Sequence, residues 1–196
     1  MIKSICKAFD QMQGLLADAG VLRAFAIGVK MAQIATKDPR FVLRFAAAHD
    51  AGLVLNFMKK LGAYQKMADQ ITATEASIHR LLVANQGEAI FGIYDGETVA
   101  FMFYNQTSSA FTGRSGLYID GFLVDDTMRH RGLGRIMMDF MCKHAADRGC
   151  QMLEWGCLDW NTPTIEFYQG LGAYCLDTMR IYRLGPDQIA ENAGRF

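Results

Sequence analysis

The chain has no excess of charge of either sign. Its 196 residues carry 20 Lys and Arg against 20 Asp and Glu, and the formal net charge is zero. Proteins that bind nucleic acids through the phosphate backbone carry a basic patch or stripe. The balanced charge therefore predicts no nucleic-acid partner, and function has to be sought in a local site.

Cysteine and histidine are too scattered to form a metal site. The five cysteines are odd in number and none lies in a Cys-x-x-Cys pair, and the four histidines have no metal-ligand spacing to them. Structural zinc sites need such closely spaced ligands. We therefore predict no metal, no disulfides and a reduced compartment, which favours a cytoplasmic location.

A long uncharged apolar run is also missing. The most apolar stretch near the beginning, Ala19 to Thr36, is interrupted by Arg23 and Lys30. A membrane-spanning helix needs about 20 nearly uncharged residues, so no transmembrane segment is expected. Asp10 lies where the apolar core of a signal peptide would be, which argues against one. Three interpretations of this stretch stay open: a docking or dimerisation element, a membrane-surface attachment, or a mobile arm.

A polar, proline-containing joint at 36–40 separates this stretch from the rest of the chain. We therefore predict a helical N-terminal extension over residues 1–40 and one domain over residues 41–196. No internal repeat and no low-complexity run interrupts that domain.

Strands and helices are mixed along the predicted domain. Asp95-Gly96 is a hairpin turn signal, Gly149 is a helix stop, and Asp50 is a candidate helix N-cap. The hydrophobic periodicities predict an α/β fold with these elements: strands at 41–45, 88–94, 98–104, 116–124, 151–159 and 179–184, and helices at 50–61, 74–82 and 132–148, with a short helix opening at Thr162-Pro163.

The first chemical signal is the segment Arg129-His130-Arg131-Gly132-Leu133-Gly134-Arg135, between a strand and a long helix. A helix N-terminus presents unpaired N–H groups and the positive end of a dipole, and glycines allow a diphosphate to approach the backbone. Arginines add charge-assisted hydrogen bonds. On this segment alone, a simple turn before an amphipathic helix explains the glycines equally well.

A second motif follows in the right place, with Trp160-Asn161-x-Pro163, then Phe167-Tyr168, then Gly172-Ala173. Together the two motifs resemble the GNAT superfamily of N-acetyltransferases, and within it the diamine (spermidine/spermine) and thialysine N-acetyltransferases. The similarity runs from about Phe41 to Leu184 and leaves residues 1–40 outside. It implies a GNAT fold, with a mixed, mostly antiparallel central sheet flanked by helices.

The resemblance implies that acetyl-CoA is the cosubstrate. Its pantetheine arm would be bound by Phe122, Leu123 and Val124. Its diphosphate would be bound by Arg129, His130, Arg131, Gly132, Leu133, Gly134 and Arg135. The remainder of the molecule would contact Asn161, Thr162, Pro163 and Thr164. It also implies a homodimer, because the amine sites of the family lie near a subunit interface.

Tyr168 falls on the family's proton donor and Asp120 on a carboxylate of the substrate side. The same resemblance assigns further residues to the amine site: Tyr64, Gln65, Glu154, Trp155 and Gly156. The chemistry fits these residue types, because a primary amine with a pKa of about 10 arrives as ammonium and must lose a proton before it attacks a thioester. Tyr168 could instead only pack its ring. For Asp120, the cost of an unpaired carboxylate in an apolar strand favours a functional role.

Two departures from the polyamine acetyltransferases concern carboxylates. Where those enzymes have two adjacent acidic residues, this chain has Asp120-Gly121. Where they have Glu after the tyrosine, this chain has Gln65. Fewer carboxylates leave fewer partners for extra ammonium groups, which favours a lysine-like substrate over spermine. Two alternative functions stay open, a protein or peptide N-acetyltransferase and a non-catalytic CoA-binding protein.

Overall fold

The computed structural model describes residues 32–196 and divides the chain into two compact units, Met1–Gly156 and Cys157–Phe196. Most of the predicted helical extension lies outside the described residues. Its described end contributes a strand, since Ile34–Ala35 form β1 and pair with β2. The sheet therefore begins before residue 41.

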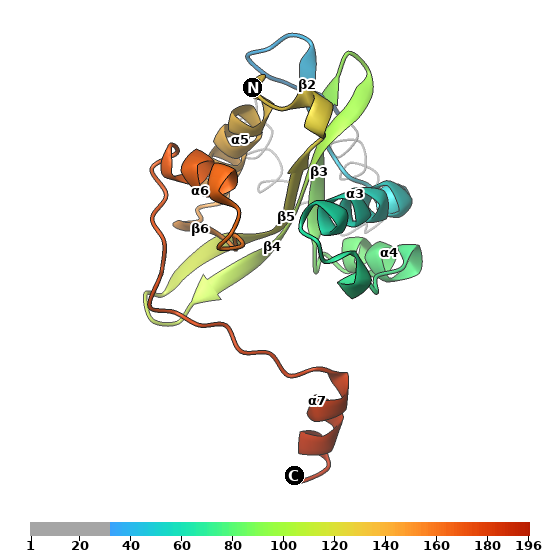
Figure 1. Ribbon diagram of the computed structural model, residues 1–196, viewed down its shortest axis with the longest axis vertical. Helices are drawn as coiled ribbons and strands as arrows, with labels where there is room; N and C mark the ends of the chain where they lie inside the picture. The colour runs from blue at the N-terminus through green and yellow to red at the C-terminus, as the bar shows by residue number, and fades with distance from the viewer. Residues whose placement is uncertain (1–31) are drawn as a thin grey trace, which may run out of the picture. The chain divides into compact units, whose positions relative to one another are not determined.

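The first unit is built on a six-stranded sheet whose spatial order follows the sequence (Figure 1). Neighbouring strands are antiparallel except β5 and β6, which are parallel, so the predicted mixed, mostly antiparallel sheet is confirmed. The strands after β1 are β2 (Phe41–Phe45), β3 (Glu88–Tyr94), β4 (Glu97–Ser109), β5 (Arg114–Val124) and β6 (Met152–Trp155).

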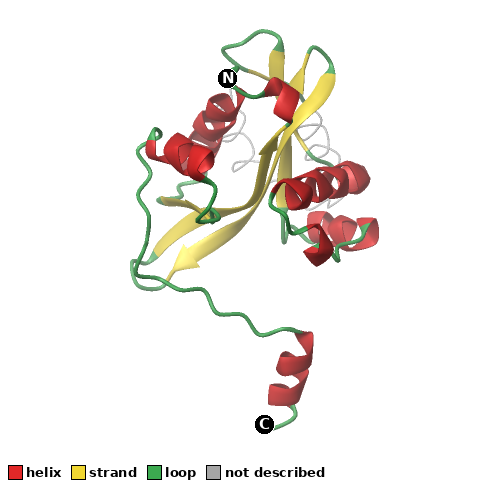
Figure 2. Ribbon diagram, viewed as in Figure 1, coloured by secondary structure: helices red, strands yellow, loops and turns green. Residues whose placement is uncertain are grey.

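Helices cover both faces of this sheet, so the unit has three layers (Figures 1 and 2). Helices α3 (Ala51–Tyr64) and α4 (Glu75–Val83) lie on one face, and α5 (Leu133–Asp147) lies on the other. Two sets of buried side chains fill the layers, one under α3 and α4 and one along α5: Val54, Phe57, Leu61, Ile78, Leu82, Phe91, Phe101 and Phe103, and Ile136, Met137, Met138 and Met141.

The turn and stop signals are confirmed. Asp95 and Gly96 have φ of +49° and +88°, as a tight β3–β4 hairpin requires, and Gly149 ends α5 with φ of +71°. Thr74 caps α4, with its hydroxyl accepting a hydrogen bond from Ser77 N–H. Local sequence therefore sets these boundaries.

Asp50 occupies the N-cap position of α3, but its side chain makes no capping bond. Its carboxylate instead accepts hydrogen bonds from both terminal nitrogens of Arg44, at 2.8 and 3.0 Å, and from Ala47 N–H at 2.7 Å. Burial raises the pKa of this carboxyl, but the bonds from Arg44 and Ala47 outweigh burial and leave the pKa below its usual value. Asp50 thus ties β2 to the start of α3.

The second unit contains α6 (Thr162–Gln169), with Pro163 in its first turn as predicted, and α7 (Pro186–Ala193), which the sequence reading missed. The strand predicted at Met179–Leu184 is wrong, since this segment is not in a strand and its large side chains are exposed. Alternating apolar residues form a strand only where a neighbour supplies the ladder of hydrogen bonds, and no described strand pairs with this segment.

Strand β5 changes its pairing in the middle. Tyr104 of β4 lies opposite Ile119, but Phe103 lies opposite Gly121, so Asp120 is an extra residue in β5 and forms a β-bulge. On its other side, β5 pairs with β6 only as far as Ile119. This is why the strand predicted at 151–159 ends at Trp155: its partner turns away at the bulge.

Candidate active site

The loop after β5 contains two residues with left-handed backbone conformation just before a helix. His130 and Gly132 both have positive φ, +61° and +77°, and Gly132 is the N-cap of α5. The first hydrogen bond of the helix runs from Ile136 N–H to Gly132 C=O at 3.1 Å, so the N–H groups of the preceding first turn have no acceptor within the helix. Loops with left-handed residues next to such N–H groups form concave sites for anions.

The three arginines of the loop are held by neighbours in the same unit. Arg129 pairs with Asp126, with 2.6 Å between Nη2 and Oδ1. Arg135 pairs with Asp139 one turn along α5, at 2.8 Å. Arg131 is exposed, and its guanidinium lies 5.9 Å from the centre of the Tyr94 ring.

Asp120 lies where the side chains of β5 change face. Tyr104 faces α5, because its hydroxyl lies 3.1 Å from Nε2 of His144, and Ile119 is opposite Tyr104 and shares that face. Gly121, two residues further on, faces α3, so the regular alternation of side chains is interrupted at Asp120. The expectation that this carboxylate sits at a cost within the apolar strand is wrong, because the bulge leaves it exposed. Burial therefore gives no support for a functional role of Asp120.

Gly121, the residue after Asp120, is packed against α3. A Cβ at this position would lie 3.0 Å from Met58 Sδ and 3.3 Å from both Leu61 Cδ2 and Phe101 Cζ. A longer side chain would require the ends of these three side chains to shift. Packing therefore disfavours a second carboxylate beside Asp120.

The open part of β5, Asp120–Val124, is paired with β4 on one side, and no described strand pairs with its other side. The backbone of the predicted pantetheine residues Phe122, Leu123 and Val124 therefore lies along a free sheet edge. The Val124 carbonyl already accepts a hydrogen bond from Arg129 Nε at 3.2 Å. An extended ligand can add to such an edge as a strand would.

The residues predicted for the amine site lie at three places in the first unit. Tyr64 is the last residue of α3, and Gln65 is its C-cap. Glu154 and Trp155 end β6 and are half-buried, and Gly156 follows them. The end of α3, the bulge and the end of β6 are the elements on which the unit carries its predicted amine residues.

The remaining predicted residues belong to the second unit. Asn161 is buried and is the N-cap of α6, which contains Thr162, Pro163 and Thr164. Tyr168 is half-buried on the same helix, and its ring lies 5.4 Å from that of Phe167, at an angle of 52°. These residues thus share one short helix.

Two features of the first unit had no sequence signal. Tyr118 pairs with Glu154 of β6, and its hydroxyl lies 3.5 Å from the position that a Cβ of Gly156 would take. The Tyr94 ring lies under two guanidinium groups, Arg131 of the loop and Arg40 of the β1–β2 connection, the latter at 4.8 Å. Only the register of the sheet brings these residues together.

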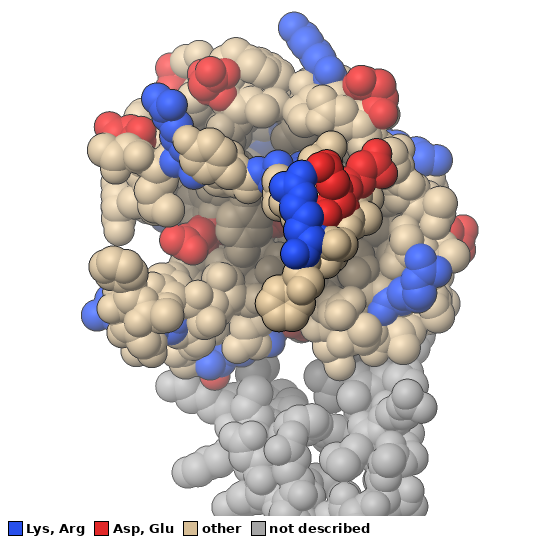
Figure 3. All heavy atoms as spheres, turned by 90° about the horizontal axis from the view of Figure 1, so that it is seen from below, with Lys and Arg blue, Asp and Glu red and all other residues tan. Residues whose placement is uncertain are grey.

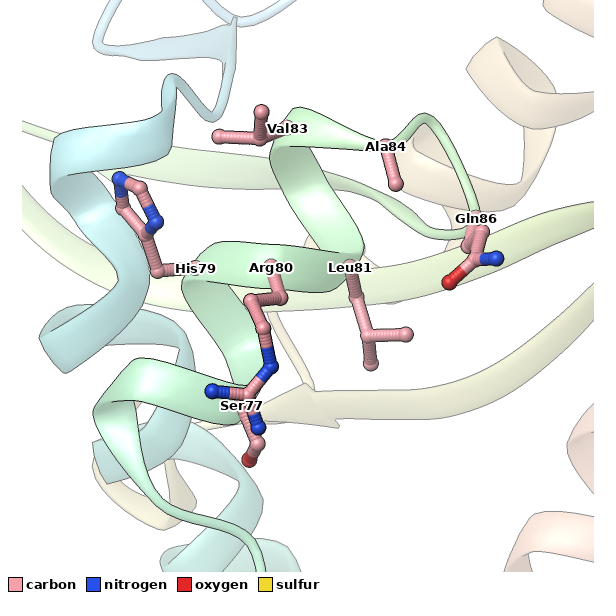
Figure 4. A pocket seen from close by; sticks show the side chains of 7 residues that line it. All are labelled: Ser77, His79, Arg80, Leu81, Val83, Ala84 and Gln86. Atoms are coloured by element: carbon pink, nitrogen blue, oxygen red, sulfur yellow. The ribbon is translucent and has the colours of Figure 1, made fainter.

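A hollow of about 650 Å³ lies elsewhere, on the outer side of α4 (Figure 4). Its lining contains no predicted site residue: Ser77, His79, Arg80, Leu81, Val83, Ala84 and Gln86. On the face drawn in Figure 3, the basic and acidic side chains of the described residues are interspersed. Within residues 32–196 no three His, Cys, Asp or Glu side chains form a metal-binding group, and no helix in that range is long and apolar enough to span a membrane.

Residues 56–173 match the model of the Acetyltransferase (GNAT) family, and the chain belongs to this family and is an acetyltransferase.

Relatives with assigned activities include the thialysine N-epsilon-acetyltransferase of Bos taurus, which is 26% identical over 79% of this chain and 98% of its own length. The L-ornithine N5-acetyltransferase NATA1 of Arabidopsis thaliana is 27% identical over 48% of this chain and 42% of its own length. Among solved structures, an aminoglycoside N-acetyltransferase, AAC(6')-Iy, in complex with CoA has the same fold, with a TM-score of 0.58 at 14% identity over 74% of this chain and 94% of that chain.

Proposed function

We propose that this acetyltransferase moves an acetyl group from acetyl-CoA to the primary amine of a small molecule, by direct attack in a ternary complex. The observation that carries the proposal is the separation of β5 from β6 at Asp120. It leaves a free strand edge, and the same stretch of chain continues directly into the anion-binding loop.

Acetyl-CoA fits the residues that would bind it. The free edge at Phe122–Val124 offers backbone groups to the amides of the pantetheine arm, and the first-turn N–H groups after Gly132 offer donors to a diphosphate. Asn161 to Thr164 would contact the cosubstrate further along. The complex of CoA with the aminoglycoside acetyltransferase supports this use of the fold.

The proposed reaction needs a base for the ammonium and an acid for the thiolate. Asp120, directly or through water, takes a proton from the ammonium, and the free amine attacks the acetyl carbonyl. A backbone N–H of the open strand stabilises the developing oxyanion. The C–N bond forms, the C–S bond breaks, and Tyr168 gives its phenolic proton to the thiolate that leaves. The nitrogen of the new amide loses its second proton to water, and Tyr168 recovers a proton from water, so one proton is released in each turnover.

The proposed substrate carries one reactive amine and a tail with little further positive charge, such as a lysine-like amino acid. Support comes from the packing at Gly121, where a longer side chain would crowd Met58 and Leu61, and from the neutral Gln65. The names of two relatives, which act on thialysine and ornithine, point to the same class of amine.

The test is an assay of thiol release from acetyl-CoA with thialysine, lysine, ornithine, putrescine and spermidine as acceptors. We expect the amino acids to give higher kcat/KM than the polyamines, and a clear preference for spermidine would refute the proposed substrate class. Turnover of peptides but of no small amine would favour a protein acetyltransferase instead.

Replacing Tyr168 with Phe removes the proposed proton donor and keeps the ring. We expect kcat to fall by about 100-fold, with CoA affinity retained, because general acid catalysis contributes about 10²–10⁴-fold. Calorimetric titration with CoA separates the two effects. An unchanged kcat would exclude Tyr168 as the donor.

A homodimer and a cytoplasmic location also remain proposals. The homodimer is supported by family resemblance, and sedimentation of the full chain measures it directly. The location is supported by the scattered cysteines: among the residues that the structure describes, Cys142, Cys150, Cys157 and Cys175 are free thiols.

A further inference from the structure

We propose that Arg129 is a positioning residue, which ties the phosphate loop to Tyr64 at the end of α3, and that its guanidinium is not itself a ligand of the diphosphate. The inference rests on the proposed function, because it concerns how the same loop binds acetyl-CoA. It implies that Tyr64, a residue of the predicted amine site, also affects the affinity for the cosubstrate.

Three contacts hold the guanidinium of Arg129. Its Nε donates to the Val124 carbonyl at 3.2 Å, and its Nη2 lies 2.6 Å from Oδ1 of Asp126. Its central carbon lies 4.5 Å from the centre of the Tyr64 ring. The side chain of Arg129 is 31% exposed, so it lies largely within these contacts.

Each contact uses a different part of the planar group. The strand end accepts from the Nε–H, the carboxylate forms an ion pair with a terminal nitrogen, and the aromatic ring covers one face. To bind a phosphate through its fork, Arg129 would have to leave the carboxylate or turn away from the ring. Its anchored position instead fixes the loop at Arg129, immediately before the left-handed residue His130.

The contacts also distinguish arginine from lysine. A lysine keeps the charge, and it binds phosphate well as a point charge, but it has no Nε–H and no planar face for the ring. A direct phosphate ligand should therefore tolerate Arg129→Lys far better than Arg129→Gln. If Arg129 is a positioning residue, both variants should lose CoA affinity to a similar degree.

The experiment is calorimetric titration of the full chain with CoA, which requires no amine and no turnover. We expect Arg129→Lys and Arg129→Gln each to weaken CoA binding by about 10-fold, as the loss of a stacked and hydrogen-bonded arginine predicts. Arg114→Lys is the matched control, because Arg114 is exposed at the opposite end of β5. It should bind CoA as the unmodified chain does.

Tyr64 provides the second arm of the test. Tyr64→Phe keeps the ring and should bind CoA within about twofold, whereas Tyr64→Ala should weaken binding by about threefold or more. The double variant Arg129→Lys with Tyr64→Ala should be no weaker than Arg129→Lys alone, because both changes remove one shared contact. In steady-state assays of Arg129→Lys, KM for acetyl-CoA should rise while kcat at saturation changes little.

The possible results separate the two proposals. If the unmodified chain fails to bind CoA, the proposed function itself is wrong. If it binds CoA and Arg129→Lys binds equally well while Arg129→Gln does not, Arg129 is a direct ligand and the inference is overturned. Additive effects of Arg129→Lys and Tyr64→Ala would also overturn it.

Discussion

The two halves of β5 have the same kind of sequence and opposite surroundings. Gly116–Ile119 is paired with β4 on one side and β6 on the other, whereas Asp120–Val124 is paired with β4 alone. Leu117 and Ile119 in the closed half are buried, and so is Leu123 in the open half. The halves differ in whether a second strand pairs with their backbone, and not in the burial of their apolar side chains.

The comparison indicates how one strand serves both stability and binding. The closed half contributes buried area and ladder bonds, and the open half keeps its side-chain packing on α3 but leaves one backbone edge free. A single extra residue, Asp120, separates the two roles. Substitutions on either side of the bulge should therefore affect different measurements.

The largest expected effect is on stability, from Leu117→Ala in the closed half. Leu117 is fully buried, and removing such a side chain leaves a cavity that costs about 2–5 kcal/mol of unfolding free energy. Urea unfolding measures the loss. The control is Val124→Ala in the open half, which is half-buried and should cost about 1 kcal/mol. Equal losses would remove the distinction between the halves.

A smaller free-energy effect, but on activity, is expected from Asp120→Asn at the bulge. The neutral amide cannot take the ammonium proton, so kcat/KM should fall by about 100-fold, which corresponds to about 2.7 kcal/mol. The unfolding free energy should change by less than about 0.5 kcal/mol, because the side chain is exposed. Full activity with Asn would show that the open half needs no carboxylate.

The smallest effect concerns pH and the junction of the two halves, where Tyr104 faces Ile119. Burial and the nearby Arg148 lower the pKa of His144, which contacts Tyr104, from its usual 6.5. The unfolded chain therefore binds a proton at a higher pH than the folded chain does, and stability should fall as the pH drops below about 6.5.

Through His144 alone, the unfolding free energy can change by at most about 1.4 kcal/mol per pH unit. Urea unfolding at pH 7.5 and 5.5, in the unmodified chain and in His144→Phe, measures this contribution. The unfolding free energy of the variant should decline less between the two pH values. Glu88, Asp147 and Lys143 also act on His144, and they are present in both proteins. Identical slopes would exclude His144 as the titrating group.

Much of the first unit could be predicted because its signals are local. Asp95-Gly96 and Gly149 mark their boundaries through backbone conformations that few residues adopt, and the apolar periodicity of α5 identifies its buried side. The glycine loop was found for the same reason. Short-range chemistry identifies these features before any tertiary contact is known.

The features that sequence reasoning missed depend on pairing between distant segments. The bulge at Asp120 arises only from the register against β4, and the early end of β6 follows from that bulge. The segment Met179–Leu184 has the alternation of a strand but no described partner. The contact of Arg129 with Tyr64 joins the end of α3 to the loop after β5. Patterns along one segment contain no information on such partners.

The tight fit at Gly121 has a consequence for how this enzyme could change its choice of amine. Because Met58 and Leu61 of α3 lie against this position, an acidic residue gained at position 121 would crowd them and should reduce the stability of the fold. New specificity is more accessible at Gln65, on the end of a helix. A mutational library that seeks polyamine acetylation should therefore diversify that position and leave Gly121 unchanged.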